Sequence, residues 1–269
     1  MKNMKIAAVC MEAHPYAIDR NLNHIADFSR KAADKGVEII CFPELSITGY
    51  ILDNPSDVYS ESISQEIIER VSQMARAINL VILAGMIEKT QRAKPYISQV
   101  VATPQGILGI YRKTHLSPPE KKFFHAGNYL SSYSYGGVIF GVQLCYDAHF
   151  PEISTKMALE GVEIIFIPHA SPRGTPDEKI QSWLRHLPAR AFDNSVFLVA
   201  CNQVGRYKND LSFPGTAMVL NPVGNIIESY SGTQEKMIIT DLKENDWREI
   251  RNHRMKHFLP HRRPELYSK

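Results

Sequence analysis

The stretch VVATPQGILGIY, residues 100–111, predicts a β-hairpin. Two short apolar runs flank a turn that has Pro104 at its second position and Gly106 at its fourth, as β-turns favour. The stretch MVLNPVGNIIESY, residues 218–230, repeats this plan around Pro222 and Gly224. Two copies in one chain indicate antiparallel hairpins at equivalent places in two halves of the molecule.

Apolar strands alternate with amphipathic helices on the amino-terminal side of the first hairpin. Buried strands are predicted at 4–11, 37–42 and 80–87. Between them, apolar residues recur at helical spacing over 18–33 and 63–78. Strands that alternate with helices in this way are typical of a mostly parallel sheet covered by helices.

The same alternation returns between the two hairpins. Strands are predicted at 136–145, 162–168 and 196–201, with a helix starting at Pro151 and another across 176–194. The simplest assembly is an α/β fold in which two mixed sheets pack face to face, each with helices outside, as a four-layer αββα sandwich. Because no linker-like or low-complexity stretch interrupts the 269 residues, we expect a single domain over 1–269.

The composition excludes several classes of partner and site. The formal charge of +3 is too small to indicate a nucleic-acid partner, and no apolar stretch is long enough for a membrane span or a signal sequence. We therefore expect a cytoplasmic protein with neither partner. The four cysteines contain no CxxC pair, which argues against a zinc site and against a disulfide framework.

Four chemically useful residues follow predicted strand ends or the loop after one, where ligands bind in α/β sheets: Glu44, Lys113, Glu120 and Cys145. A thiolate is a nucleophile, a carboxylate can take its proton, and an ammonium with the backbone N–H of Tyr146 can stabilise an oxyanion. Each also has an ordinary explanation. Glu44 could cap a loop, Lys113 could lie on the surface, Glu120 could start a helix, and Cys145 could be an inert core residue.

Three segments resemble the signature segments of the nitrilase superfamily, the carbon–nitrogen hydrolases: CFPELSITGY, YRKTHLSPPEKKFFHAG and GVQLCYDAHFPE. The resemblance implies Glu44 as general base and acid, Lys113 as oxyanion stabiliser and Cys145 as nucleophile, with Glu120 positioning the lysine or the substrate. It also implies the αββα fold and no metal or organic cofactor. It further implies a homodimer, or a higher homo-oligomer, that packs through the helix at about 151–160 and the tail at about 255–269.

The resemblance also narrows the reaction. Cys145-Tyr146-Asp147 is similar to the amidase and carbamoylase branches, whereas true nitrilases tend to carry Trp and then Glu after the nucleophile. It therefore implies hydrolysis of a non-peptide C–N bond in a small linear amide or N-carbamoyl compound, through a thioester, with release of ammonia. The expected substrate contacts are Tyr50, Phe124, Tyr146, His149, His169, Ala170, Ser171 and Arg173, with Arg173 as a possible carboxylate contact.

His149 stands where the family often has Arg, and a structural histidine is the favoured interpretation there. Two other functions stay open at this point. A thiol acyltransferase would share the acyl-enzyme, and a binding or regulatory scaffold would keep the residues without the activity.

Overall fold

The computed structural model describes residues 1–52, 55, 59–207 and 211–267, so the last two residues of the predicted tail lie outside the described residues. Within these ranges, two six-stranded sheets form the centre of the molecule, and a two-stranded ribbon, β10 (Gly205–Arg206) with β11 (Ser212–Phe213), lies apart from them. The two large sheets are called sheet A and sheet B.

Sheet A is mixed, with three parallel strands in its middle. Its order is β14 (Lys236–Leu242), β1 (Met4–Cys10), β2 (Ile39–Cys41), β3 (Val81–Glu88), β4 (Tyr96–Thr103) and β5 (Gly106–Arg112). β1, β2 and β3 are parallel, β4 and β5 form an antiparallel hairpin at one edge, and β14 pairs antiparallel with β1 at the other.

Sheet B repeats this arrangement. Its order is β13 (Ile226–Gly232), β12 (Gly215–Leu220), β9 (Phe197–Asn202), β8 (Ile164–His169), β7 (Val138–Val142) and β6 (Ser132–Tyr135). β7, β8 and β9 are parallel, and the β12–β13 hairpin lies at the edge next to β9. The two predicted hairpins therefore occupy equivalent edges, and the sequence-based prediction is confirmed.

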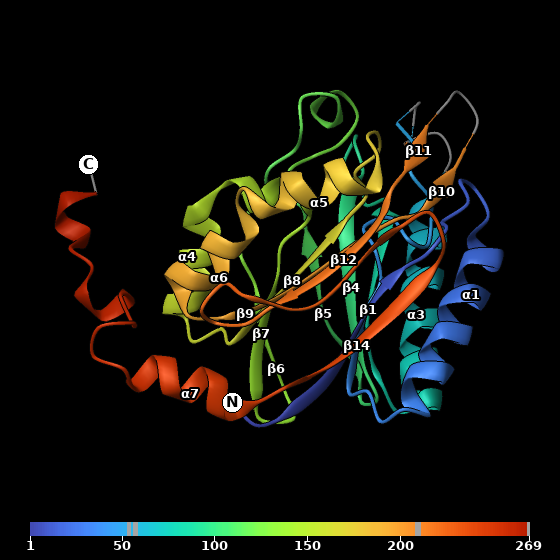
Figure 1. The fold of residues 1–269 in the computed structure, drawn as a ribbon. Helices are drawn as coiled ribbons and strands as arrows, with labels where there is room; N and C mark the ends of the chain where they lie inside the picture. The colour runs from blue at the N-terminus through green and yellow to red at the C-terminus, as the bar shows by residue number, and fades with distance from the viewer. Residues whose placement is uncertain (53–54, 56–58, 208–210, 268–269) are drawn as a thin grey trace.

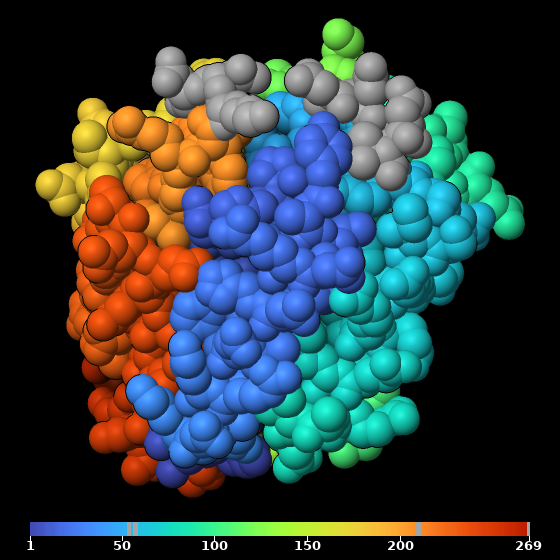
Figure 2. Space-filling view, turned by 90° about the vertical axis from the view of Figure 1, so that its right-hand side faces the viewer, coloured from blue at the N-terminus to red at the C-terminus, as the bar shows by residue number. Residues whose placement is uncertain are grey.

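Helices cover the outer face of each sheet. The helices are α1 (Ile18–Ala33), α3 (Glu61–Ile78), α4 (Pro151–Leu159), α5 (Pro176–Leu184), α6 (Leu187–Asn194) and α7 (Glu244–Asn252). α1 and α3 lie on one side of the sheets and α4, α5 and α6 on the other (Figure 1). The space-filling view shows α1 and α3 side by side over sheet A, with the carboxyl-terminal strands along the other flank of α1 (Figure 2). This is the expected αββα sandwich.

Alternation along the strands fills the two kinds of interface. In β1, Ile6 and Ala8 face sheet B, whereas Ala7 and Val9 belong to the core beneath α1. Successive side chains of a strand point to opposite faces, so one strand serves both layers. Cys10, Cys41 and Cys201 are buried between the sheets as free thiols of the core.

The predicted boundaries differ from the structure in three places. The helix expected across 176–194 is two helices, because the chain leaves helical geometry at His186. The strand expected to reach Cys145 ends at Val142. The edge strands β6 and β14 were not predicted, and β14 completes sheet A beside β1.

Candidate active site

Cys145 lies at a sharp turn just beyond the carboxyl end of β7. Its φ angle is 44°, in the left-handed region that residues with a side chain rarely adopt, and it starts the short 3₁₀ helix Cys145–His149. Such backbone strain persists only where the surrounding structure holds it in place. The turn lifts the thiol out of the strand, and the residue keeps partial contact with solvent.

The carboxylate of Asp147 holds this turn. Asp147 is fully buried and accepts hydrogen bonds from the Leu144 N–H at 2.9 Å and the Tyr111 hydroxyl at 2.9 Å. Its other oxygen accepts from the Thr114 hydroxyl at 2.8 Å and the His115 N–H at 2.7 Å. These bonds fasten the nucleophile turn to the segment that follows β5, which is also the segment that carries Lys113.

Lys113 links two carboxylates inside the protein. Its Nζ lies 2.8 Å from Glu44 Oε1 and 2.7 Å from Glu120 Oε1, and all three side chains are almost completely buried. Glu120 is fixed in turn by the Ser117 N–H, which donates to its Oε2 at 2.7 Å. An ammonium has three hydrogens, so Lys113 retains one for a further acceptor.

Glu44 is positioned by its surroundings through backbone and side chain. Its Oε2 accepts the Ala170 N–H at 2.9 Å, and its backbone carbonyl accepts the Gln203 side-chain amide at 2.8 Å. β3 passes close behind it, because a Cβ on Gly85 would lie 2.3 Å from the Leu45 nitrogen. Contacts from both sheets therefore hold this carboxylate.

The electrostatics of these groups are coupled. Burial raises the pKa of Glu44 to about 7, with Lys113 opposing the rise and Glu120 adding to it. Burial alone would lower the pKa of Lys113, but the attraction of Glu44, Cys145 and Glu120 keeps it well above its usual value. The protein atoms around the Cys145 sulfur, followed by the Glu44 charge, raise the thiol pKa. At rest the Cys145 thiol is therefore protonated, and the Glu44 carboxylate acts on it electrostatically.

Tyr50 lies in the same neighbourhood. Burial raises the pKa of its phenol, and the charges of Glu120 and Glu44 raise it further. Its ring packs edge-on against Phe213, at a centroid distance of 5.5 Å. Tyr50 is partly exposed, and its contact with substrate stays a prediction.

Two of the predicted substrate contacts are histidines whose rings pack against other side chains of the protein. His149 is exposed and stacks on His186 at 4.7 Å, and Arg190 binds its backbone carbonyl. His169 is buried against Trp183, with ring centroids 4.4 Å apart, and its Nδ1 bonds to the Ile167 carbonyl. These contacts are those of structural histidines, the interpretation favoured for His149 from the sequence, and contact of either side chain with substrate stays a prediction.

The segment after β8 contributes to the site through its backbone N–H groups. Ala170 reaches Glu44 through its backbone N–H, and the Ser171 N–H donates to Asn202 Oδ1 at 2.8 Å. Arg173 is exposed, and its N–H binds the Ser212 carbonyl. Phe124 belongs to the buried core, and Tyr146 is partly exposed beside the nucleophile. For these residues, direct contact with substrate stays a prediction.

Two residues with consequences for this site were not singled out from the sequence as parts of it. Asp147 was treated only as a neighbour of the cysteine, although its place two residues after Cys145 was a usable signal. Lys179, on α5, bonds to Ser171 Oγ at 2.7 Å and exerts its charge on Cys145. Nothing in the local sequence around Lys179 indicated that proximity.

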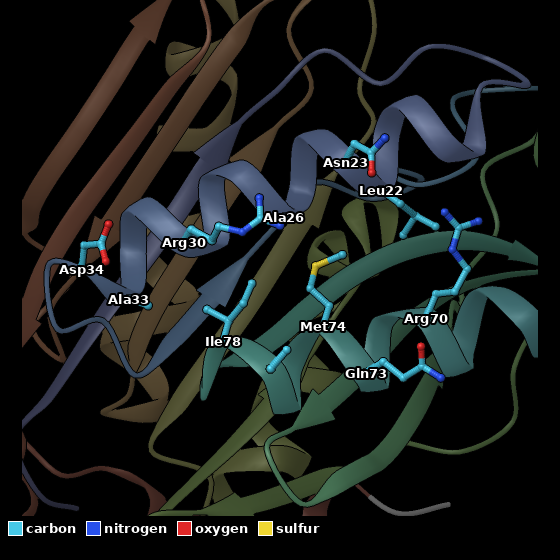
Figure 3. Close-up of a pocket in the computed structure, with 11 residues that line it drawn as sticks. Leu22, Asn23, Ala26, Arg30, Ala33, Asp34, Arg70, Gln73, Met74 and Ile78 are labelled. Carbon is cyan, nitrogen blue, oxygen red and sulfur yellow. The ribbon is translucent and has the colours of Figure 1, made fainter.

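A separate groove of about 690 Å³ lies between α1 and α3 (Figure 3). Met74 and Ile78 extend from α3 toward α1, and Arg30 and Arg70 lie along the groove. Both arginines have acidic partners, Asp27 and Asp19 respectively. The groove is on the outer side of sheet A and is lined by none of the residues described around Cys145, so it is not the reaction site.

Comparisons with known proteins agree with this geometry. The carbon-nitrogen hydrolase family model matches residues 5–252. A nitrilase from Pyrococcus abyssi is 29% identical over 271 residues, covering 98% of this chain and 99% of that protein. An (R)-stereoselective amidase from a Pseudomonas species is 30% identical over 212 residues, covering 79% and 74%.

Solved structures of an amidase from Nesterenkonia sp. AN1 resemble this fold with a TM-score of 0.86 at 25% identity, covering 98% of this chain and 95% of that one. One of them shows the acetamide moiety of fluoroacetamide added covalently at the active-site cysteine of that amidase. The match of the family model across nearly the whole chain decides the assignment. This chain belongs to the carbon–nitrogen hydrolase family and is an enzyme of the nitrilase superfamily.

Proposed function

We propose that this enzyme hydrolyses a non-peptide C–N bond in a small linear amide or N-carbamoyl compound through a thioester on Cys145. The observation that carries the proposal is the buried Lys113 ammonium held between Glu44 and Glu120, with all three charges acting on the Cys145 thiol. A nucleophile, a base with a pKa near neutrality and a fixed cation are the parts that such a reaction requires.

Glu44 acts first as a base in the proposed acylation step. It takes the thiol proton as the sulfur attacks the substrate carbonyl, and the carbonyl electrons move onto oxygen. The remaining N–H of Lys113 and the backbone N–H of Tyr146 stabilise the oxyanion. When the tetrahedral intermediate collapses, the C–N bond breaks, and protonated Glu44 returns its proton to the leaving nitrogen.

The same carboxylate then serves in deacylation. Ionised again, Glu44 removes a proton from a water molecule that attacks the thioester. The second tetrahedral intermediate collapses with cleavage of the C–S bond, and Glu44 returns the proton to the sulfur. A pKa of about 7 suits a group that must both accept and donate a proton near neutral pH.

The choice of amide and carbamoyl substrates over nitriles rests on Tyr146 and Asp147, which resemble the residues after the nucleophile in the amidase and carbamoylase branches. Asp147 is occupied by four donors that fix the turn, so its oxygens are committed to structure. Relatives of this chain include proteins named as amidases from Pseudomonas and Bacillus subtilis, the second described as a 2-oxoglutaramate amidase. A relative from Pyrococcus is named as a nitrilase, so the distinction requires an experiment.

Ammonia release measured over a substrate panel tests the proposal. The panel contains small amides, ω-amides, N-carbamoyl amino acids, N-carbamoyl amines and nitriles, and Cys145→Ala is the blank. We expect turnover of an amide or carbamoyl compound and almost none of nitriles. Efficient nitrile turnover would overturn the choice of branch, and equal ammonia release by the Cys145→Ala blank would overturn the role of the thiol.

Mass spectrometry of the acid-quenched enzyme tests the thioester directly. Glu44→Gln should accumulate an adduct of the acyl group on Cys145, because the base for deacylation is missing. The adduct should disappear on treatment with hydroxylamine, which cleaves thioesters. Product formation without any adduct, in this variant and in the wild type, would contradict a covalent route.

We further propose that two chains assemble through the face formed by α4, α6 and the carboxyl-terminal segment. Figure 1 shows this segment running beside α4 and α6, away from the sheets. Phe258 of the segment packs on Phe192 of α6 at 5.5 Å. Large apolar side chains are exposed on these elements: Leu159, Phe192, Met255, Phe258, Leu266 and Tyr267. Phe192→Asp should give monomers in sedimentation velocity, whereas Tyr129→Asp, at an exposed site elsewhere, should leave the assembly unchanged.

A further inference from the structure

Lys179, on α5, is a partly buried ammonium with no ion-pair partner among the described residues. Its Nζ donates to Ser171 Oγ at 2.7 Å and lies 3.5 Å from the Pro172 carbonyl. Both acceptors are neutral, and no carboxylate of the described residues lies within 4.0 Å of this nitrogen. The nearby Glu178 is used by its own helix start, where its carboxylate accepts the Thr175 N–H.

The position of Lys179 is fixed by a chain of hydrogen bonds that begins at Glu44. Ala170 binds the Glu44 carboxylate through its N–H, and the next residue, Ser171, binds Lys179 through its hydroxyl. Ser171 is held by Asn202 on both sides of its backbone, at 2.8 and 3.1 Å. The ammonium is therefore held beside the loop that positions the proposed base.

The positive charge of Lys179 acts electrostatically on Cys145. Burial lowers the pKa of Lys179, and the Cys145 thiolate acts in the opposite direction. The same ammonium lowers the pKa of Cys145. Lys113 and Lys179 therefore both act electrostatically on Cys145, and among the described residues only Lys113 has carboxylates within 4.0 Å.

A partly desolvated cation without a counter-ion is costly unless another molecule supplies one. We propose that Lys179, with Ser171, binds a carboxylate at the far end of the substrate, so that the preferred substrates are amides or N-carbamoyl compounds bearing a terminal carboxylate. This inference rests on the proposed function, because it names the class of amide that the same site selects. It assigns the anchor to α5, whereas the sequence had suggested Arg173, whose side chain is exposed.

Paired substrates test the inference without assuming the length of the site. Linear monoamides of three to six carbons with a terminal carboxylate are compared with amides in which a methyl group replaces that carboxylate. We expect the kcat/KM of the wild type to favour the best carboxylate substrate by about 10- to 100-fold over its neutral partner, as a charged hydrogen bond would give. In Lys179→Met this ratio should fall to near one, and Lys179→Arg should restore part of it.

The control is Lys31→Met, which removes an exposed lysine of α1 on the opposite side of the molecule. This variant should keep the wild-type ratio. A wild-type preference for neutral amides would overturn the inference. Selectivity for the carboxylate that survives in Lys179→Met would also overturn it, because another cation would then be the anchor.

A binding measurement separates this inference from the proposed function. Calorimetry with Cys145→Ala compares glutaramate with pentanamide and requires no turnover. Glutaramate should bind more tightly, and the double variant Cys145→Ala/Lys179→Met should lose that advantage. If the wild type hydrolyses none of the panel but this advantage depends on Lys179, the proposed reaction fails and the anchor stands. Equal binding of the two ligands by Cys145→Ala would overturn the anchor.

Discussion

Glu120→Gln should shift the acid limb of the pH–rate profile toward lower pH. The 2.8 and 2.7 Å distances of Glu44 and Glu120 from the same Lys113 nitrogen add up to a limit of about 5.5 Å between the two carboxylates. At that separation, two unit charges repel by about 3 kcal/mol at an effective dielectric constant of about 20. This energy corresponds to about two pKa units on Glu44.

The direction of this shift follows from the effect of the Glu120 charge on the pKa of Glu44. Glu44 must be ionised to accept the thiol proton, and its folded-state pKa is raised to about 7, so activity falls as the pH drops below 7. The charge of Glu120 contributes to that raised pKa. Removing the charge while keeping the size of the side chain should therefore move the limb from about pH 7 toward about pH 5.

The assay is kcat/KM for ammonia release between pH 4.5 and 9, on the best substrate of the panel. Glu66→Gln, an exposed carboxylate on α3, is the matched control and should leave the limb in place. The maximal rate of Glu120→Gln should also fall, because the Ser117 N–H loses a charged acceptor. An unmoved limb, or one moved to higher pH, would refute the coupling between these two carboxylates.

Three further outcomes follow from the positions of single residues. In urea denaturation, Cys145→Gly should have a free energy of unfolding about 1 kcal/mol greater than that of Cys145→Ala, because glycine adopts a φ of 44° without strain. A lower free energy of unfolding for Cys145→Gly would contradict backbone strain at this position. Gly85→Ala should lower kcat by about 10- to 100-fold and lower Tm, because the added Cβ meets the Leu45 nitrogen and pushes Glu44 out of place; unchanged kinetics would contradict that close approach. Asp147→Asn should lower the free energy of unfolding by about 2 kcal/mol and reduce kcat, because an amide cannot accept all four donors; equal urea midpoints and rates would show that the turn does not depend on the charge.

The layers of the fold could be predicted because they depend on patterns within short stretches of the sequence. Alternating strands and helices define each half, and the turns at Pro104 and Pro222 identify the equivalent hairpins. β14 was missed because it is an edge strand whose partner, β1, lies at the other end of the chain. The periodicity of apolar residues indicates which face of a strand is buried, but it does not indicate which other strand pairs with it.

The site was predictable to the level of residue type and strand end. Glu44, Lys113 and Cys145 lie just past strands, Glu120 lies in the loop after one, and the structure brings Glu44 and Glu120 into contact with Lys113. The surroundings of His169 could not be predicted, because residues at the end of a strand alternate between faces. Its side chain points toward Trp183 on the helix side, whereas the next residue, Ala170, faces Glu44.

The pairing of β1 with β14 has a consequence for how the protein reaches its native state. Residues 4–10 are synthesised long before residues 236–242, the strand that completes their sheet. Contacts between such distant segments slow folding, since a long loop must close before they form. Until β14 is made, β1 lies at an unpaired edge of the sheet and can pair with other chains. We therefore expect a chaperone that covers this edge to raise the yield of active enzyme.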